Sequence, residues 1–254
     1  MSDEVLVERR GAVQVITINR PEARNAINGA VATGVRDAVD ELDADSALSV
    51  GVLTGAGGTF SSGMDLKAFL KGETPSFPGR GLAGITQTPP RKPMIAAAEG
   101  YALAGGFELA MACDLVVAGA SAKFGVPEVK RSLVAGAGGA LLLARRIPRA
   151  LALEMLLTGD PFDARRAFDI GLVNRVVDDG QALDAAIELA GKIAANGPLA
   201  LMATKEISNG GADWSADERW DQMARIMAPV FTSQDAQEGA RAFAEKRAPV
   251  WKGQ

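Results

Sequence analysis

The sequence of 254 residues contains no histidine. This absence excludes Ser-His and Cys-His nucleophile pairs, His-ligated zinc sites and any imidazole general base. There is a single cysteine, Cys113, so the chain can form neither an intrachain disulfide nor a metal site made only of cysteines. Carboxylates, backbone amides, hydroxyls and the side chains of Lys and Arg are the groups left for chemistry.

Long apolar runs and an excess of basic residues are also missing. No stretch of about 18 apolar residues occurs, and the N-terminal residues are acidic, so we expect neither a membrane span nor a signal peptide. The net charge of −4 argues against a general affinity for nucleic acid or an anionic membrane. The sequence predicts a cytoplasmic protein with no nucleic-acid partner and no membrane partner.

Glycine is abundant, with 29 residues, many of them in turns between short apolar segments. Apolar and β-branched runs predict strands, and apolar residues at helical spacing predict helices, so the alternation indicates an α/β architecture. The expected strands are residues 12–18, 50–53, 94–98, 115–118 and 172–177. The expected helices are residues 30–42, 104–112, 140–146, 151–156, 164–169, 183–195 and 199–207.

Two other stretches have a distinct composition. Residues 72–90 are rich in Gly, Pro, Ser and Thr, which predicts a long mobile loop of the type that often carries binding function. Residues 214–244 predict two helices separated near Pro229. Their large apolar residues, Trp220 and Phe231 among them, exceed what a lone tail helix could bury, so we expect subunit contacts there.

No motif for a nucleotide cofactor is complete. The glycine-rich runs that start at Gly55 and Gly136 begin like a dinucleotide-binding fingerprint, but the sixth position is Phe60 in one and Leu141 in the other. No Walker A sequence occurs either. We therefore expect no bound cofactor.

Three glycine-containing segments follow predicted strands, and they carry residues suited to catalysis. They are residues 60–67, 100–108 and 124–128. Ligands of open α/β sheets bind outside such strand ends. Where Gly105 opens a helix, free N–H groups point outward, and the missing Cβ lets a substrate oxygen approach. A second amide from the turn at Met64 would complete a two-donor oxyanion hole.

Two glutamates accompany these amides. Glu108 lies in the first turn of the predicted helix, and Glu128 follows Pro127. Taken separately, Glu108 also fits a carboxylate favoured by a helix N-terminus, and Glu128 also fits a solvated loop charge. Taken together, one ionised and one protonated carboxyl beside an oxyanion hole can add or remove the elements of water.

These motifs, in this order, resemble the enoyl-CoA hydratase/isomerase (crotonase) superfamily over nearly the whole chain. The matching elements are Asn19-Arg20-Pro21 with Asn25-Ala26, Gly63-Met64-Asp65-Leu66, Gly105-Gly106-Phe107-Glu108, Phe124-Gly125-Val126-Pro127-Glu128 and a helical signature in residues 158–177. The resemblance implies an α/β spiral of ββα units in residues 1–195, followed by a helical trimerisation region in residues 196–254. It also implies a homotrimer or a dimer of trimers.

The resemblance further implies roles for single residues. The amides of Met64 and Gly105 would hold the thioester oxygen of an acyl-CoA substrate, Glu108 would orient water, and Glu128 would exchange the proton at the α-carbon. Coenzyme A enters as part of the substrate, with no separate cofactor. The residues expected to contact it, largely through backbone atoms, are Ala23, Arg24, Ala26, Asp65, Leu66 and Lys67. Met64 replaces a common alanine and would narrow the pocket.

Three hypotheses remain open from the sequence. The leading one is a 2-enoyl-CoA hydratase that adds water syn across the double bond to give a 3-hydroxyacyl-CoA. The second is a double-bond isomerase, for which Glu128 alone would suffice, or a dehydratase of a specialised acyl-CoA. The third is a crotonase-fold protein that binds RNA or an assembly partner without catalysis. It is motivated by the arginines Arg145, Arg146, Arg149, Arg165 and Arg166.

Overall fold

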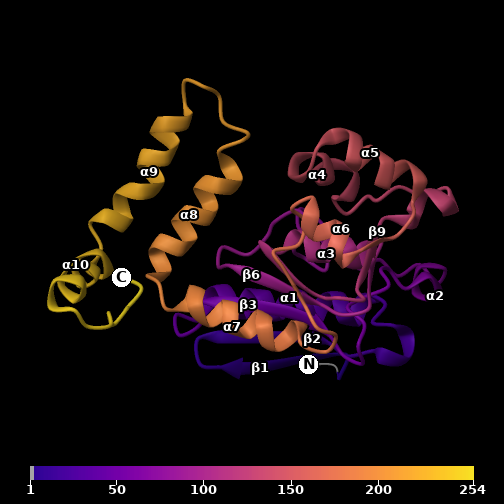
Figure 1. The fold of residues 1–254 in the computed structure, drawn as a ribbon, viewed down its shortest axis with the longest axis horizontal. Coiled ribbons are helices and arrows are strands. Elements are labelled where there is room, and N and C mark those ends of the chain that lie inside the picture. Colours follow the sequence, from indigo (N-terminus) through magenta and orange to yellow (C-terminus); the bar gives the residue numbers. More distant parts are fainter. Residues whose placement is uncertain (1–2) are drawn as a thin grey trace.

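A six-stranded sheet forms the centre of the computed structural model, which describes residues 3–254 (Figure 1). The strand order is β1-β2-β3-β6-β8-β11; β1 runs antiparallel to β2, and the later neighbours pair in parallel. The strands are β1 (Val5–Arg10), β2 (Val13–Ile18), β3 (Val50–Gly55), β6 (Met94–Ala98), β8 (Leu115–Gly119) and β11 (Arg175–Val177).

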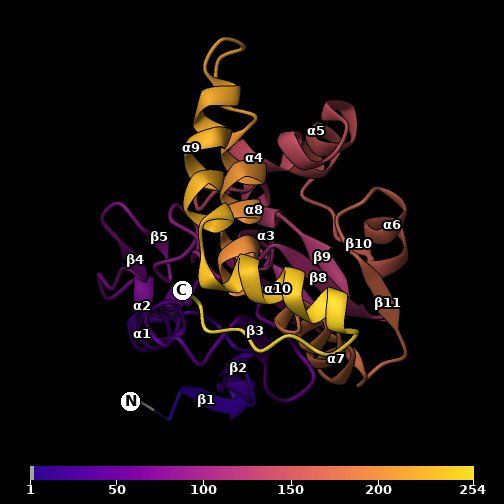
Figure 2. The ribbon, with the colours of Figure 1, turned by 90° about the vertical axis from the view of Figure 1, so that its left-hand side faces the viewer.

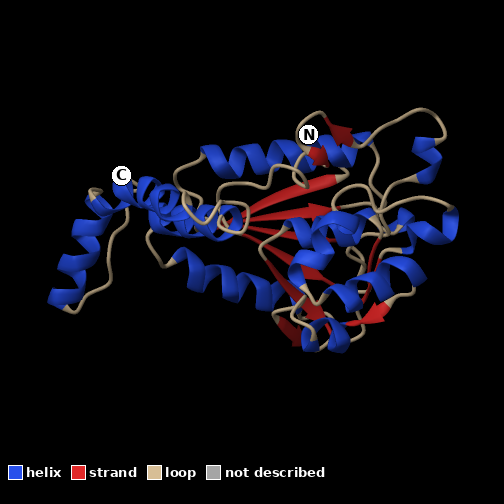
Figure 3. Cartoon of the chain, turned by 90° about the horizontal axis from the view of Figure 1, so that it is seen from above, coloured by secondary structure: helices blue, strands red, loops and turns tan. Residues whose placement is uncertain are grey.

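Helices cover both faces of this sheet (Figure 3). Residues with one parity along the strands, such as Val15, Val52 and Ile95, pack against α7 (Ala182–Ala194). Residues of the other parity, such as Ile16 and Leu53, belong to a second core cluster with α1 (Gly29–Ala44) and α3 (Gly105–Ala112). Successive strand side chains point to opposite faces, so strands covered on both sides read as continuous apolar runs.

Smaller elements surround the carboxyl ends of the central strands. A three-stranded sheet contains β7 (Tyr101–Leu103), β9 (Lys123–Gly125) and β10 (Phe162–Asp163), and a two-stranded one contains β4 (Ser76–Phe77) and β5 (Gly81–Leu82). The short helices are η1 (Pro21–Ala23), α2 (Leu66–Phe69) and η2 (Pro127–Arg131). The remaining helices of the body are α4 (Gly139–Arg146), α5 (Arg149–Thr158) and α6 (Ala164–Asp169).

The last three helices extend away from the body in Figure 1, and in Figure 2 they lie in front of it. They are α8 (Pro198–Gly210), α9 (Arg219–Phe231) and α10 (Gln234–Glu245). Neither α8 nor α9 has a buried residue, and Trp220 and Phe231 are 67% and 72% exposed. No helix within residues 3–254 combines the length and the apolar character that crossing a bilayer requires.

The structure corrects several expectations. Pro229 lies inside α9, and the helix break comes at Thr232, because the side chain of Ser233 accepts a hydrogen bond from Ala236 N–H and caps α10. The strand expected at residues 172–177 begins only at Arg175. Residues 72–90 are not an open loop: they contain β4 and β5, and their apolar residues Leu82, Ala83 and Ile85 are buried.

Candidate active site

Two backbone amides from distant turns lie side by side. The turn at Gly63 has a φ of +95°, and a Cβ placed on Gly63 would lie 3.0 Å from the amide nitrogen of Gly105. A Cβ placed on Gly105 would in turn lie 3.5 Å from the amide nitrogen of Met64. Within residues 3–254, neither the Met64 nor the Gly105 amide donates a hydrogen bond. Both N–H groups are therefore available to one acceptor.

The backbone before α3 is strained. Ala104, its N-cap, has φ 51° and ψ −129°, a conformation that costs a non-glycine residue roughly 1–3 kcal/mol. A hydrogen bond from Ala104 N–H to the Gly125 carbonyl, at 2.9 Å, holds it there. The strain directs the first amide of α3 toward the Met64 turn, where the helix dipole favours negative charge.

Glu108 is only 5% exposed, in the first turn of α3. Its Oε1 accepts a hydrogen bond from Gly139 N–H at 2.8 Å, at the start of α4. The pKa of this carboxyl is raised to about 7, because burial and, to a smaller extent, the charge of Glu128 raise it more than the amides of Gly139 and Ala137 lower it. At neutral pH Glu108 can therefore either take or give a proton.

Glu128 lies in η2, half-buried. Its Oε2 is buried and has no hydrogen-bond partner within residues 3–254. Burial raises the pKa of this carboxyl, and Arg131 opposes the shift. The structure thus brings Glu128 close enough to Glu108 for its charge to act there, with one carboxyl oxygen left for a ligand.

The residues expected at coenzyme A surround the Met64 turn. Ser62 N–H donates to the Arg24 carbonyl at 3.0 Å, and Ile27 N–H donates to the Gly63 carbonyl at 2.8 Å. These bonds place Ala23, Arg24 and Ala26 beside Asp65, Leu66 and Lys67, which open α2. Leu66 and Lys67 are exposed, as a surface that receives a large ligand requires.

The structure adds residues that the sequence analysis did not assign. Gly139 comes from the glycine run that fails as a dinucleotide fingerprint, and that run was the one available signal for its role. A Cβ on Gly105 would lie 2.8 Å from Cδ2 of Leu82, so Leu82 forms an apolar wall beside the two amides. No sequence signal marked Leu82, because it lies within the expected loop.

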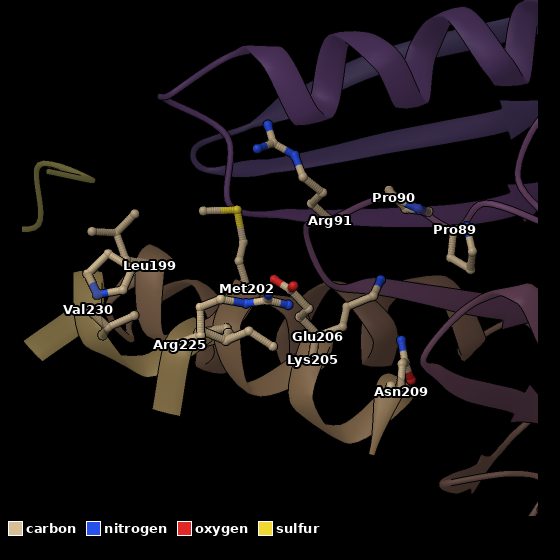
Figure 4. A pocket seen from close by; sticks show the side chains of 14 residues that line it. Pro89, Pro90, Arg91, Leu199, Met202, Lys205, Glu206, Asn209, Arg225 and Val230 are labelled. Atoms are coloured by element: carbon tan, nitrogen blue, oxygen red, sulfur yellow. The ribbon is translucent and has the colours of Figure 1, made fainter. Parts of the chain in front are cut away.

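A separate cavity of about 880 Å³ lies between α8, α9 and residues 89–91 (Figure 4). Met202 and Lys205 on α8 line it, as does Arg225 on α9, whereas none of the amides or glutamates above does. The cavity is therefore a feature of the C-terminal helices, separate from Glu108 and Glu128. Within residues 3–254 no cluster of three Cys, Asp or Glu side chains suits a metal ion.

The model of the enoyl-CoA hydratase/isomerase family matches residues 8–254. The chain belongs to this family. It is 44% identical to enoyl-CoA hydratase EchA19 of Mycobacterium tuberculosis, over 97% of this chain and 95% of the relative. It is 40% identical to a carnitinyl-CoA dehydratase of Salmonella typhi, over the full length of both.

Solved structures of the enoyl-CoA hydratase/isomerase family have the same fold. The crystal structure of enoyl-CoA hydratase EchA1 from Mycobacterium marinum superposes with a TM-score of 0.98, at 59% identity over the full length of both chains. These matches confirm the crotonase fold and show that the chain is an enzyme of the enoyl-CoA hydratase type.

The non-catalytic hypothesis also loses its motivation. Arg145 pairs with Asp213 at 2.8 Å, Arg166 pairs with Glu154 at 2.9 Å, and Arg165 pairs with Asp169 at 3.0 Å. These three of the five arginines have carboxylate partners within the chain, and the non-catalytic hypothesis is overturned by the similarity to enzymes of the enoyl-CoA hydratase type.

Proposed function

We propose that this enzyme adds water syn across the double bond of a 2-enoyl-CoA thioester and forms a 3-hydroxyacyl-CoA. One observation carries the proposal: two amides without acceptors lie side by side at the start of α3, which carries Glu108, and Glu128 is close enough to raise the pKa of that carboxyl. The relatives named enoyl-CoA hydratase support the same reaction.

The two amides act on the thioester oxygen. When the oxygen of a water that is losing its proton bonds to C3, negative charge moves onto the thioester oxygen as an enolate forms. The N–H groups of Met64 and Gly105 donate to it and stabilise the enolate more than the neutral thioester. One such donor lowers the activation free energy by roughly 3–4 kcal/mol.

The two glutamates move the protons. Ionised Glu108 takes a proton from water while the oxygen bonds to C3, and protonated Glu128 gives its proton to C2 of the enolate. Gly139 N–H occupies Oε1 of Glu108, so Oε2 is left for the water. At the end of the addition Glu108 is protonated and Glu128 is ionised. Proton exchange with solvent then restores the starting state. The reverse sequence removes water.

Coenzyme A is held, in this proposal, by the backbone around Ala23, Arg24 and Ala26 and by Asp65, Leu66 and Lys67. These two segments flank the Met64 amide. The enzyme thereby holds the coenzyme A part of the substrate next to the Met64 amide, which polarises the thioester carbonyl. No other cofactor is needed for the reaction.

The test is the loss of absorbance of a conjugated short-chain 2-enoyl-CoA during hydration. Glu108→Gln and Glu128→Gln should each reduce kcat by at least about a hundredfold, while circular dichroism stays unchanged. Glu41→Gln, an exposed glutamate on α1, serves as the matched control with wild-type turnover. Full activity in both site variants would refute the proposal.

A dehydratase acting on a specialised 3-hydroxyacyl-CoA is the second candidate, because the chain also matches carnitinyl-CoA dehydratases over its full length. The same groups run the elimination, so the substrate decides. A panel of 3-hydroxyacyl-CoA thioesters assayed for dehydration separates the two. An isomerase would instead convert a 3-enoyl-CoA and keep that activity after Glu108→Gln.

We also propose that residues 196–254 assemble the chain into a homotrimer or a dimer of trimers. The support is the absence of any buried residue in α8 and α9 together with the exposed Trp220 and Phe231. Apolar helix faces of this extent need a partner in water. Light scattering of the purified protein gives the mass of the assembly.

A further inference from the structure

Arg20, the centre of the Asn-Arg-Pro element, bridges two segments of the site. Its side chain is 15% exposed. Nη1 donates to the Ala26 carbonyl at 2.7 Å and to Oδ2 of Asp65 at 3.0 Å. Nε lies 3.3 Å from Oε1 of Glu4. The guanidinium therefore ties the segment before α1 to the segment before α2, two parts of the chain that meet only through tertiary structure.

Asp65 is the residue next to Met64, and its carboxylate has two functions. Oδ1 accepts hydrogen bonds from Lys67 N–H at 3.0 Å and Ala68 N–H at 3.2 Å, which caps α2, while Oδ2 receives Arg20. Burial acts to raise the pKa of Asp65, but the capping amides and the Arg20 guanidinium outweigh it and lower the pKa. The carboxylate is thus ionised and held from both sides.

The backbone on each side of Met64 is fixed as well. Ile27 N–H donates to the Gly63 carbonyl at 2.8 Å, and Asp65 N–H donates to the Ile27 carbonyl at 2.9 Å. Ile27 directly follows Ala26, whose carbonyl Arg20 holds. Arg20 therefore holds both segments of this short parallel pairing, one through the Ala26 carbonyl and the other through Asp65. Met64 lies within the second segment, and its N–H is free.

We infer that Arg20 is a positioning residue: through Asp65 and the Ala26 carbonyl it sets the direction of the Met64 amide toward the thioester oxygen. The inference rests on the proposed function. The alternative is that Arg20 is a cation for a phosphate of coenzyme A. The contacts favour the positioning role, because its Nη1 and Nε atoms already face the carbonyl and two carboxylates.

The two roles are separated by a pair of substrates with the same 2-enoyl group. One is the coenzyme A thioester, and the other is the N-acetylcysteamine thioester, which carries no phosphate. Arg20→Met should lower kcat about tenfold on both substrates. A Met64 N–H displaced by a fraction of an ångström weakens catalysis whichever thiol carries the acyl group. A loss confined to the coenzyme A thioester, or seen only in KM, would overturn the inference.

The matched control is Arg9→Met on the edge strand β1. This variant removes an exposed ion pair with Asp45 and should leave kcat unchanged. Asp65→Asn keeps the Oδ1 acceptor for the α2 cap but removes the charge that Arg20 meets. Because Arg20 and Asp65 act as one unit, the double variant should lose no more than the worse single variant. Losses that multiply would contradict the coupling.

A probe that needs no turnover keeps this test independent of the proposed reaction. A conjugated dienoyl-CoA bound to the wild type should absorb at longer wavelength than in water, because donors at the carbonyl oxygen polarise the conjugated system. In Arg20→Met the shift should shrink, with binding retained. A full shift in that variant would overturn the inference, whereas failure of the proposed function would appear as absent turnover in the wild type.

Discussion

Glu108 should make the folded protein less stable as the pH rises, and Glu108→Gln should remove that dependence. The carboxyl is 5% exposed, and burial is the main cause of its pKa of about 7, against an ordinary value of 4.5. Glutamine has nearly the same shape and keeps an oxygen that accepts the hydrogen bond of Gly139 N–H. The substitution therefore removes the titration while keeping the packing.

The sign follows from the direction of the pKa shift. Folding raises the pKa, so the protonated form is favoured in the folded state relative to the unfolded chain. The corresponding stability is fully present below pH 4.5 and is lost as the pH rises through about 7. At about 1.4 kcal/mol for each pH unit, the loss amounts to about 3 kcal/mol by pH 8.

Urea unfolding at pH 5 and pH 8, at one protein concentration, measures this difference. The free energy of unfolding of Glu108→Gln relative to wild type should increase by about 2.5 kcal/mol between the two pH values. Glu41→Gln should show no such change. An unchanged difference would mean that burial does not set the pKa of Glu108, and a change of opposite sign would mean that the Gly139 and Ala137 amides dominate.

Three further predictions concern the amides, the proton pair and the C-terminal helices. Gly105→Ala should lower kcat about a hundredfold without unfolding the protein, because its Cβ would stand 3.5 Å from Met64 N and 2.8 Å from Cδ2 of Leu82, which must shift beside the two amides; steady-state kinetics with circular dichroism checks this, and retained turnover would contradict it. Hydration needs one ionised and one protonated carboxyl, and both pKa values are raised, so kcat should fall in acid, where both carboxyls are protonated, and again in base, where both are ionised; a flat pH–rate profile would argue against the pair. Trp220→Glu, at a side chain 67% exposed, should reduce the mass measured by light scattering; an unchanged mass would exclude α9 from the assembly.

One fully buried strand and one largely exposed helix were predicted with their observed bounds. The strand at residues 94–98 and the helix at residues 164–169 have the bounds that the sequence predicts. A strand covered on both faces must be apolar throughout, so its composition marks it. β1 was missed because it is an edge strand with exposed Glu8, Arg9 and Arg10, and such a strand needs only one apolar face.

Residues 72–90 show what composition cannot indicate. Their Gly, Pro and Ser residues are typical of loops, yet Arg80 reaches Asp40 on α1 with two hydrogen bonds of 2.9 and 2.7 Å. Arg36 also stacks over the ring of Phe77 at 4.3 Å. These contacts join residues about 40 positions apart. They help to fold residues 72–90 against α1, and no local sequence pattern indicates them.

The sequence indicated the single residues of the candidate site but not the long-range hydrogen bonds that connect them. Met64, Gly105, Glu108 and Glu128 each belong to a short motif that the sequence displays. The bond from Gly139 to Glu108 spans 31 residues, and the bridge from Arg20 to Asp65 spans 45. Such contacts arise only from the tertiary structure, so the sequence indicates the candidate groups but not the contacts that orient them.

The unsatisfied features of the site are complementary to one chemical species. Ala104 is strained, two amides have no acceptor, Glu108 is buried with a raised pKa, and an oxygen of Glu128 has no partner. Each of these costs stability in the free enzyme. An enolate thioester with an adjacent water offers what is missing: one oxygen that accepts from both amides, a water proton for Glu108 and a carbon that Glu128 can protonate. Since the match is to the charge of the intermediate rather than to a neutral ester, the arrangement favours a catalyst over a binding protein.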